Sequence, residues 1–346
     1  MSHQSLQPIR RLLWVIGTLI ASPALAQDSV TSFYRDTQVK LLVGGAAGGG
    51  YDAYARLIAR HIGRYIPGNP SIVVQHMPGA GGSKVAEFLY TTAPKDGSVF
   101  VATQPGALME PLLGEQGKAR YDSTKFTYLG SANSETSLCI MRSEAPIKKF
   151  DDAFTQTAIL GATAAGGSTN AFPKALNAVL GTKFKVIAGY KGTSEISLAL
   201  ERGEVDGFCG QFWSSVSTQR PGWVTSNSYR FIAQEALKGN PDLDKKGVPL
   251  AYSYAKSEDD KKVLRLIYGP LVFGRVFLMP PDVPSERIEA FRTAFAQTLK
   301  DERLLDEAAK SGLSIEHVSG EEVQALVADL YSMPEPIVRR AQEAAR

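Results

Sequence analysis

The sequence has few of the residues that build metal centres, redox sites or nucleophilic active sites. Its 346 residues include two cysteines and four histidines, and no Cys/His set has the spacing of a zinc site. It also lacks H-E-x-x-H, G-x-S-x-G and G-x-x-x-x-G-K-[ST], so it has no signature of a zinc protease, a serine hydrolase or a phosphate-binding loop. We therefore expect neither a metal nor a cofactor.

An excess of charge of one sign is also missing. Lysine and arginine number 38 and aspartate and glutamate 35, so the net charge is 38 − 35 = +3. Arg10 and Arg11 lie in a segment that we expect to be removed, which leaves 36 − 35 = +1. A chain this close to neutral lacks the basic face that binds nucleic acid or anionic lipid. We expect no nucleic-acid partner.

Long apolar runs are absent, and the short run at residues 12–20 follows a basic start. It precedes Ala24-Leu25-Ala26, which fits the small-x-small rule for signal-peptide cleavage. The run is too short to cross a hydrocarbon layer of about 30 Å. We therefore expect residues 1–26 to be a signal peptide, Gln27 to begin the mature chain, and the protein to be periplasmic. The Arg10-Arg11 pair leaves the Sec and twin-arginine export routes both open.

Glycine is abundant, with 32 residues, and it gathers between strand-like and helix-like segments. Residues 39–43 form a short apolar run, glycine-rich residues 44–50 follow, and apolar residues then recur at helical spacing through 54–65. The same order of elements recurs after residues 72–75 and after residues 158–160. Strand, glycine loop and helix in succession indicate an α/β fold with mainly parallel strands.

The length and the repeated pattern indicate two α/β units, since domains typically hold roughly 100–200 residues. Strands near residues 127–130 and 229–233 are placed to cross between them. We assign residues 27–130 and 228–346 to lobe 1 and residues 131–227 to lobe 2.

Three glycine loops, at residues 44–50, 79–82 and 166–168, each lie between the carboxyl end of a strand and the start of a helix. Ligands of open α/β sheets bind at this edge. A helix start offers unpaired backbone N–H groups and a partial positive charge, and glycine lets a ligand approach the backbone closely. The loops contain no Arg or Lys, so they predict an anion site made from backbone, with Lys191, in a fourth turn, as the candidate cation.

Other readings of these loops are weaker. Gly48-x-Gly50-x-x-Ala53 loosely matches a dinucleotide fingerprint, but the strand at residues 72–76 does not end in the carboxylate that a ribose needs. Asp52 either holds its loop through backbone N–H groups, accepts a hydrogen bond from a ligand or water, or is a plain first-turn acid. His76 is either a packing residue at a strand end or a catalytic base.

Residues 41–52, followed by Ala55-Arg56-Leu57, resemble the opening motif of the Bug receptors. These are the periplasmic substrate-binding proteins of tripartite tricarboxylate transporters. The chain departs from the family pattern just before the glycines, where a proline and an aromatic residue are usual and Leu42-Val43 stand instead. Further segments resemble later family motifs in the same order, and these are residues 77–82, 94–97, 166–168, 189–192 and 203–206.

The resemblance implies a two-lobed clamshell, each lobe a mainly parallel sheet flanked by helices, that closes on a small carboxylate. It implies a monomer that performs no chemistry and delivers its ligand to the small and large membrane subunits of the transporter. A secreted α/β enzyme acting on a small carboxylate or phosphate ester is the alternative. The implied ligand-binding residues are Gly45, Ala46, Ala47, Gly48, Gly49 and Asp52 in the first loop, Gly79, Ala80, Gly81 and Gly82 in the second, and Gly166, Gly167, Ser168, Thr169, Asn170, Tyr190, Gly192 and Asp206 in the other lobe.

Cys139 and Cys209 fall in two predicted strands of the same lobe. Because the periplasm is oxidising, we expect a disulfide between them, with two separate buried thiols as the alternative.

Overall fold

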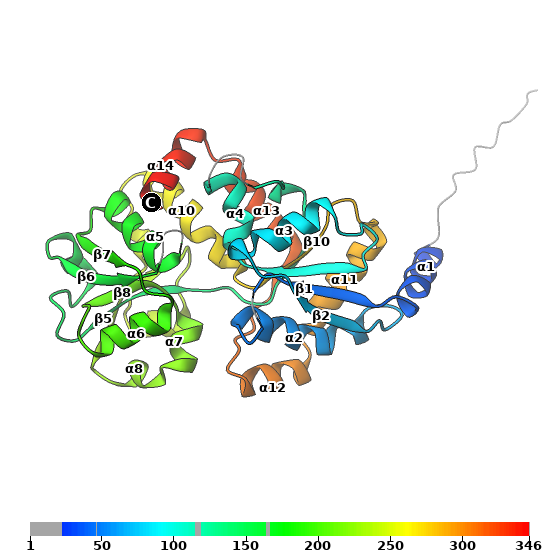
Figure 1. The fold of residues 1–346 in the computed structure, drawn as a ribbon, viewed down its shortest axis with the longest axis horizontal. Coiled ribbons are helices and arrows are strands. Elements are labelled where there is room, and N and C mark those ends of the chain that lie inside the picture. The colour runs from blue at the N-terminus through cyan, green and yellow to red at the C-terminus, as the bar shows by residue number, and fades with distance from the viewer. Residues whose placement is uncertain (1–22, 46, 115–118, 164–166, 346) are drawn as a thin grey trace, which may run out of the picture.

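A computed structural model of the chain describes residues 23–45, 47–114, 119–163 and 167–345. It has two lobes, each built on one β-sheet with helices on both faces (Figure 1). The expected two-lobed α/β fold is confirmed. The expected signal peptide lies mostly outside the described residues, and the predicted mature N-terminus falls within helix α1 (Pro23–Arg35). No helix of the described residues is long and apolar enough to cross a bilayer.

The sheet of the first lobe has the strand order β11-β4-β10-β3-β1-β2. Strand β1 pairs in parallel with β2 and β3, whereas β10 runs antiparallel between β3 and β4. The sheet is therefore mixed, whereas a mainly parallel sheet was expected, because β10 and β11 run antiparallel to their neighbours. The strands are β1 (Val39–Val43), β2 (Ile72–His76), β3 (Val99–Thr103), β4 (Thr127–Ser131), β10 (Val276–Met279) and β11 (Val318–Ser319).

Successive side chains of β1 point to opposite faces of the sheet, and helices cover both faces. Leu41 and Val43 pack with Tyr54 and Leu57 of α2 on one face, and Leu42 packs with residues of α3 on the other. The apolar stripe expected for the first helix is therefore confirmed. The helices of this lobe are α2 (Gly50–Ile62), α3 (Ser83–Thr91), α4 (Pro105–Leu113), α11 (Ser285–Thr298), α12 (Glu302–Lys310) and α13 (Gly320–Tyr331).

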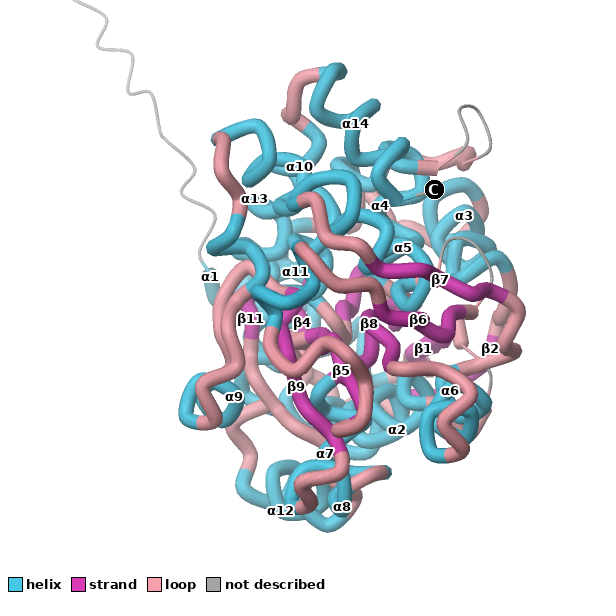
Figure 2. Tube along the Cα trace, turned by 90° about the vertical axis from the view of Figure 1, so that its left-hand side faces the viewer, coloured by secondary structure: helices cyan, strands magenta, loops and turns pink. Residues whose placement is uncertain are grey.

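The sheet of the second lobe has the order β7-β6-β8-β5-β9 (Figure 2). Strands β7, β6 and β8 are parallel, and β5 runs antiparallel between β8 and β9. Its strands are β5 (Ser137–Arg142), β6 (Ala158–Ala162), β7 (Phe184–Ala188), β8 (Gly207–Phe212) and β9 (Tyr229–Glu235). Its helices are α5 (Ser168–Ala175), which continues as a π-helical turn, α6 (Thr193–Glu201), α7 (Trp213–Gln219), α8 (Pro221–Thr225) and α9 (Pro241–Lys245).

The crossings between the lobes differ from the expected boundary at residue 228. The first crossing follows β4 through residues 132–136, as expected. Strand β9, however, pairs with β5 along residues 229–235 and belongs to the second sheet, so the chain returns only after Glu235. Helices α10 (Glu258–Tyr268) and α14 (Glu335–Ala345) then pack against each other and against α5, and α14 also packs on α4 of the first lobe.

Cys139 of β5 and Cys209 of β8 form a disulfide, with a sequence separation of 70 residues. Both side chains are fully buried in the core of the second lobe. The predicted bridge is confirmed, and it ties together neighbouring antiparallel strands.

Candidate functional site

Four helices begin at the carboxyl ends of parallel strands and share one kind of start. Helices α2, α3, α5 and α6 have the N-cap residues Gly49, Gly82, Gly167 and Gly192, and no side chain in the described part of the chain caps any of them. Helices α9, α10, α12 and α13, by contrast, are capped by the side chains of Asn240, Ser257, Asp301 and Ser319. The glycine-capped helices therefore present N–H groups that a ligand can satisfy.

The first loop is held in shape by Asp52. This buried carboxylate accepts a hydrogen bond of 2.7 Å from the Gly48 N–H and pairs at 2.8 Å with both Arg56 and His76. Burial alone would raise its pKa, but these hydrogen bonds more than offset burial and hold the pKa of Asp52 below its usual 3.8. Of the roles considered for Asp52, holding the loop through its N–H groups is confirmed.

The second loop has a left-handed backbone throughout. Gly79, Ala80, Gly81 and Gly82 have φ values of 145°, 45°, 60° and 96°, a region that favours glycine. A Cβ on Gly82 would lie 2.3 Å from Thr103 Oγ1 and closer still to the Gln104 side chain. Gly82 is therefore required for the loop to close over the end of β3.

Thr103 and Gln104, at the end of β3, connect the first two loops, and the sequence pattern did not single them out. The same two side chains lie 2.9 Å and 3.1 Å from where a Cβ on Gly44 would stand. Thr103 donates to the Gly82 carbonyl at 3.3 Å and lies 3.4 Å from Gln104 Oε1. The Gln104 amide therefore lies between the two loops, where it can reach a ligand held by either. The sequence feature that could have identified Gln104 as a candidate is its position directly after a parallel strand.

The third loop is fastened to its own lobe by the first residues of α5. Ser168 donates to the Gly210 carbonyl at 2.8 Å. Thr169 accepts from the Thr163 N–H at 3.0 Å, and the Asn170 amide donates to the Thr163 carbonyl at 3.3 Å. The Asn170 side chain is buried, and its Oδ1 has no hydrogen-bond partner among the described residues.

The weaker candidates of this lobe divide into two groups. Tyr190 and Gly192 follow β7 and precede α6 at the loop edge, and the Lys191 side chain is exposed beside them. Asp206 lies at the opposite end of the sheet, before β8, where its carboxylate accepts from the Ile159 N–H at 2.8 Å. The structure therefore does not bring Asp206 together with the glycine loops. Ala46 and Gly166 lie outside the described residues.

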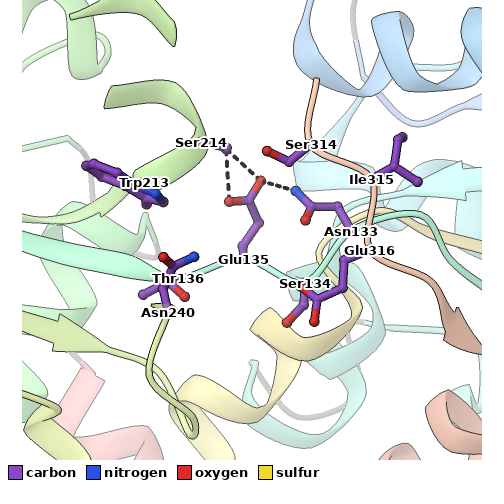
Figure 3. A pocket seen from close by; sticks show the side chains of 10 residues that line it. All are labelled: Asn133, Ser134, Glu135, Thr136, Trp213, Ser214, Asn240, Ser314, Ile315 and Glu316. Carbon is purple, nitrogen blue, oxygen red and sulfur yellow. Dashed lines mark hydrogen bonds between the residues drawn. The ribbon is translucent and has the colours of Figure 1, made fainter. Parts of the chain in front are cut away.

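A buried ion pair at the crossing between the lobes was also not predicted. Glu135 and Arg275 are 3.0 Å apart, and Arg275 lies over the rings of Tyr51 and Tyr54 at 4.7 Å and 5.0 Å from their centroids. Ser214, at the start of α7, donates to both oxygens of Glu135 (Figure 3). Burial raises the pKa of Glu135, although Arg275 and Ser214 favour its charged form. The network therefore connects both lobes through the crossing segment.

A cavity of about 300 Å³ adjoins this network and is lined from both lobes (Figure 3). Trp213 and Asn240 come from the second lobe, and residues 314–316 from the first. None of the glycine-loop residues that the structure describes lines it. Within the described residues, one group of side chains has the types and spacing of a metal site, namely Cys139, Cys209 and Glu235. Its sulfurs are bonded to each other, so they offer no thiolate.

We compared the chain with family models, curated proteins and solved structures. No family model matches the chain. A curated relative, the UPF0065 protein in the TAR-I ttuE-ttuC' intergenic region of Agrobacterium vitis, is 23% identical over 306 residues, 86% of this chain and 80% of the relative. A TctC solute-binding protein from Polaromonas has a TM-score of 0.68 at 16% identity, covering 90% of this chain and 98% of that one. MatC from Rhodopseudomonas palustris, with bound malate, has a TM-score of 0.60 at 19% identity, covering 90% and 99%.

The fold is that of the two-lobed solute-binding proteins. Within that class, the chain resembles TctC and Bug proteins in fold, and the periplasmic binding protein BugD has a TM-score of 0.58 at 20% identity, covering 89% of this chain and 96% of that one. The resemblance inferred from the glycine loops is thereby confirmed.

Proposed function

We propose that the protein is a periplasmic receptor that binds a small carboxylate between its lobes and delivers it to the membrane subunits of a tripartite tricarboxylate transporter. The observation that carries the proposal is the set of four helix starts with glycine N-caps at the carboxyl ends of parallel strands. Their N–H groups and helix dipoles attract an anion without a side-chain cation. The malate bound to MatC is a ligand of this chemistry.

The proposed ligand-binding residues are those of the three loops, with Gln104 added and Asp206 left out. Gly45, Ala47, Gly49 and the second loop contribute from one lobe, and residues 167–170, Tyr190 and Gly192 from the other. Asp52 acts on the ligand through the shape of its loop, because its oxygens already accept from Gly48, Arg56 and His76.

The enzyme alternative needs a nucleophile beside the Asp52–His76 pair. In the described part of the chain, His76 makes its only side-chain hydrogen bond to Asp52, so no serine, threonine or cysteine stands ready for activation. The arrangement therefore favours binding without chemistry. Turnover of a carboxylate ester or phosphate ester that disappears in His76→Ala would overturn this conclusion.

The direct test is a thermal-shift screen of acetate, succinate, L-malate, adipate and citrate, with succinamide as the neutral control of succinate. A ligand at 100 times its Kd stabilises the folded protein by about 2.7 kcal/mol. We expect at least one di- or tricarboxylate to stabilise the protein and the diamide to do nothing. Equal stabilisation by succinate and its diamide would contradict an anion site. Delivery is tested by carboxylate uptake into proteoliposomes containing the two membrane subunits, with and without the receptor.

A further inference from the structure

Glu235, the last residue of β9, is a fully buried carboxyl group that the proposed site does not use. Its Oε2 accepts from the Gly210 N–H at 2.7 Å and from the Ser137 hydroxyl at 2.9 Å. Its Oε1 lies 3.5 Å from the Cys139 sulfur of the disulfide. No lysine or arginine among the described residues pairs with it. Burying a carboxylate without a cation is costly. We therefore ask what the two hydrogen bonds that Glu235 accepts do for the structure.

The first of those bonds satisfies a break in the β5–β8 ladder. Leu138 pairs with Gln211 and Ile140 with Phe208, so β8 has one residue more than β5 between these pairs. Gly210 lies in this bulge with a φ of +78°. A bulge leaves backbone groups without ladder partners. Glu235 accepts from the Gly210 N–H, and the Gly210 carbonyl accepts from Ser168.

The start of α5 rests directly on this bulge. A Cβ on Gly210 would lie 2.4 Å from the Ser168 carbonyl group and 2.5 Å from the Thr169 nitrogen. The backbone of Gly210 and the first turn of α5 are therefore in contact without any side chain between them. A continuous chain of hydrogen bonds runs from Glu235 through Gly210 to Ser168.

We propose that Glu235 is a positioning residue for the second-lobe part of the ligand site, which it holds in place through the Gly210 bulge and the Ser168 hydroxyl. The disulfide braces the same bulge, because Cys209 precedes Gly210 and is bonded to the strand opposite. The ligand part of this proposal rests on the proposed function. The structural part, that Glu235 controls the start of α5, does not.

The ionisation of Glu235 adds a dependence on pH. Burial raises the pKa of Glu235 to about 7, although the bonds from Gly210 and Ser137 favour the charged form. Among the described residues, Tyr268 of α10 also faces it, and the pKa of Tyr268 lies well above its usual 10.0 because of burial, so this tyrosine stays neutral. The disulfide sulfurs of β5 and β8 do not titrate. Hydrogen bonds to a charged acceptor are about twice as strong as neutral ones, so α5 is held more firmly above pH 7 than below it.

The test measures amide hydrogen exchange of residues 168–175 in the oxidised full chain between pH 5.5 and 8.5, as protection factors corrected for intrinsic rates. In the wild type we expect protection to rise about fivefold across pH 7. Glu235→Gln should show the low-pH protection at every pH. Asp301→Asn, a buried carboxylate that caps α12 in the other lobe, should follow the wild type. Equal protection in Glu235→Gln and wild type at every pH would overturn the proposal.

Two further measurements keep the test decisive. Ser168→Ala removes the last hydrogen bond of the chain, so its α5 protection should not change across pH 7, and this variant decides the matter if Glu235→Gln does not fold. Calorimetric titration with L-malate should show weaker binding in Glu235→Gln and a wild-type affinity that rises through pH 7. If the wild type binds none of the screened carboxylates, the proposed function fails while the exchange data still decide the role of Glu235.

Discussion

Two glycines of the loops allow the backbone account of anion binding to be tested without disturbing the fold. Gly48 and Gly81 have φ values of +77° and +60°, and a Cβ on either would meet no atom within 4 Å. Alanine at these positions therefore costs the strain of a left-handed backbone, roughly 1–2 kcal/mol, without a clash. The methyl group would project into open space at the loop, where a ligand must approach the N–H groups.

The matched controls are Gly181→Ala and Gly247→Ala. Both glycines have positive φ values, of +86° and +71°, and open space around the Cβ position, but they lie away from the three loops. We expect all four alanine variants to lose a similar free energy of unfolding, and only Gly48→Ala and Gly81→Ala to bind the ligand more weakly. The expected loss is one or more factors of ten in Kd, each worth about 1.4 kcal/mol.

Lys191→Ala completes the comparison, because this exposed lysine lies in the turn that precedes α6, the fourth of the glycine-capped helices. We expect its Kd to change by less than roughly threefold, since screened charges at the surface contribute little. The assays are calorimetric titration of the carboxylate found by the screen and thermal unfolding of each variant. Loss of binding in Lys191→Ala alone, with both loop-glycine variants binding normally, would refute the backbone account.

Four further predictions concern processing and stability. The intact mass of protein from the periplasm should correspond to a chain beginning at Gln27, and a chain retaining Met1 would contradict export. Unreduced, denatured protein should show no free thiol, and reducing the Cys139–Cys209 bridge should lower the free energy of unfolding by about 4 kcal/mol in the chain-entropy model. Asp52→Asn should cost about 2 kcal/mol at pH 7. Because the folded pKa of the Asp52 carboxylate is depressed, the stability it contributes is present above its usual 3.8 and lost as pH falls through the folded value, so wild type and variant should converge in acid denaturation. Arg275→Met should destabilise the protein by roughly 3–5 kcal/mol, since it leaves a buried carboxylate unpaired, and a loss below 1 kcal/mol in urea unfolding would contradict that.

The parts of the fold that the sequence predicted are those determined by neighbouring residues. The run at residues 39–43, the glycines after it and the helical stripe of α2 follow one another in the chain, so each constrains the next. The role of Asp52 was accessible for the same reason, since its partner Gly48 is four residues away. Strand β9 was assigned to the wrong lobe because sheet membership depends on pairing with β5, which no local pattern encodes.

The side chains that the sequence missed come from distant segments. Gln104 reaches the first two loops from the end of β3, and Glu235 supports α5 through two hydrogen bonds with Gly210 between them. Neither belongs to a motif, because the chemistry of each depends on where the sheet places it. A polar residue directly after a parallel strand is the one signal that would have found Gln104.

Arg275 provides the sharpest check on the backbone account, because it places a cation that the sequence did not predict beside the first loop. Its Nη2 lies 3.7 Å from where a Cβ on Gly50 would stand. Glu135 opposes that charge at 3.0 Å, and at the same loop Arg56 opposes Asp52 at 2.8 Å. Each of these cations is matched by a carboxylate, so the two pairs add no net positive charge for a ligand. Under the proposed function, the field that attracts an anion to this loop is therefore assigned to the N–H groups at the start of α2.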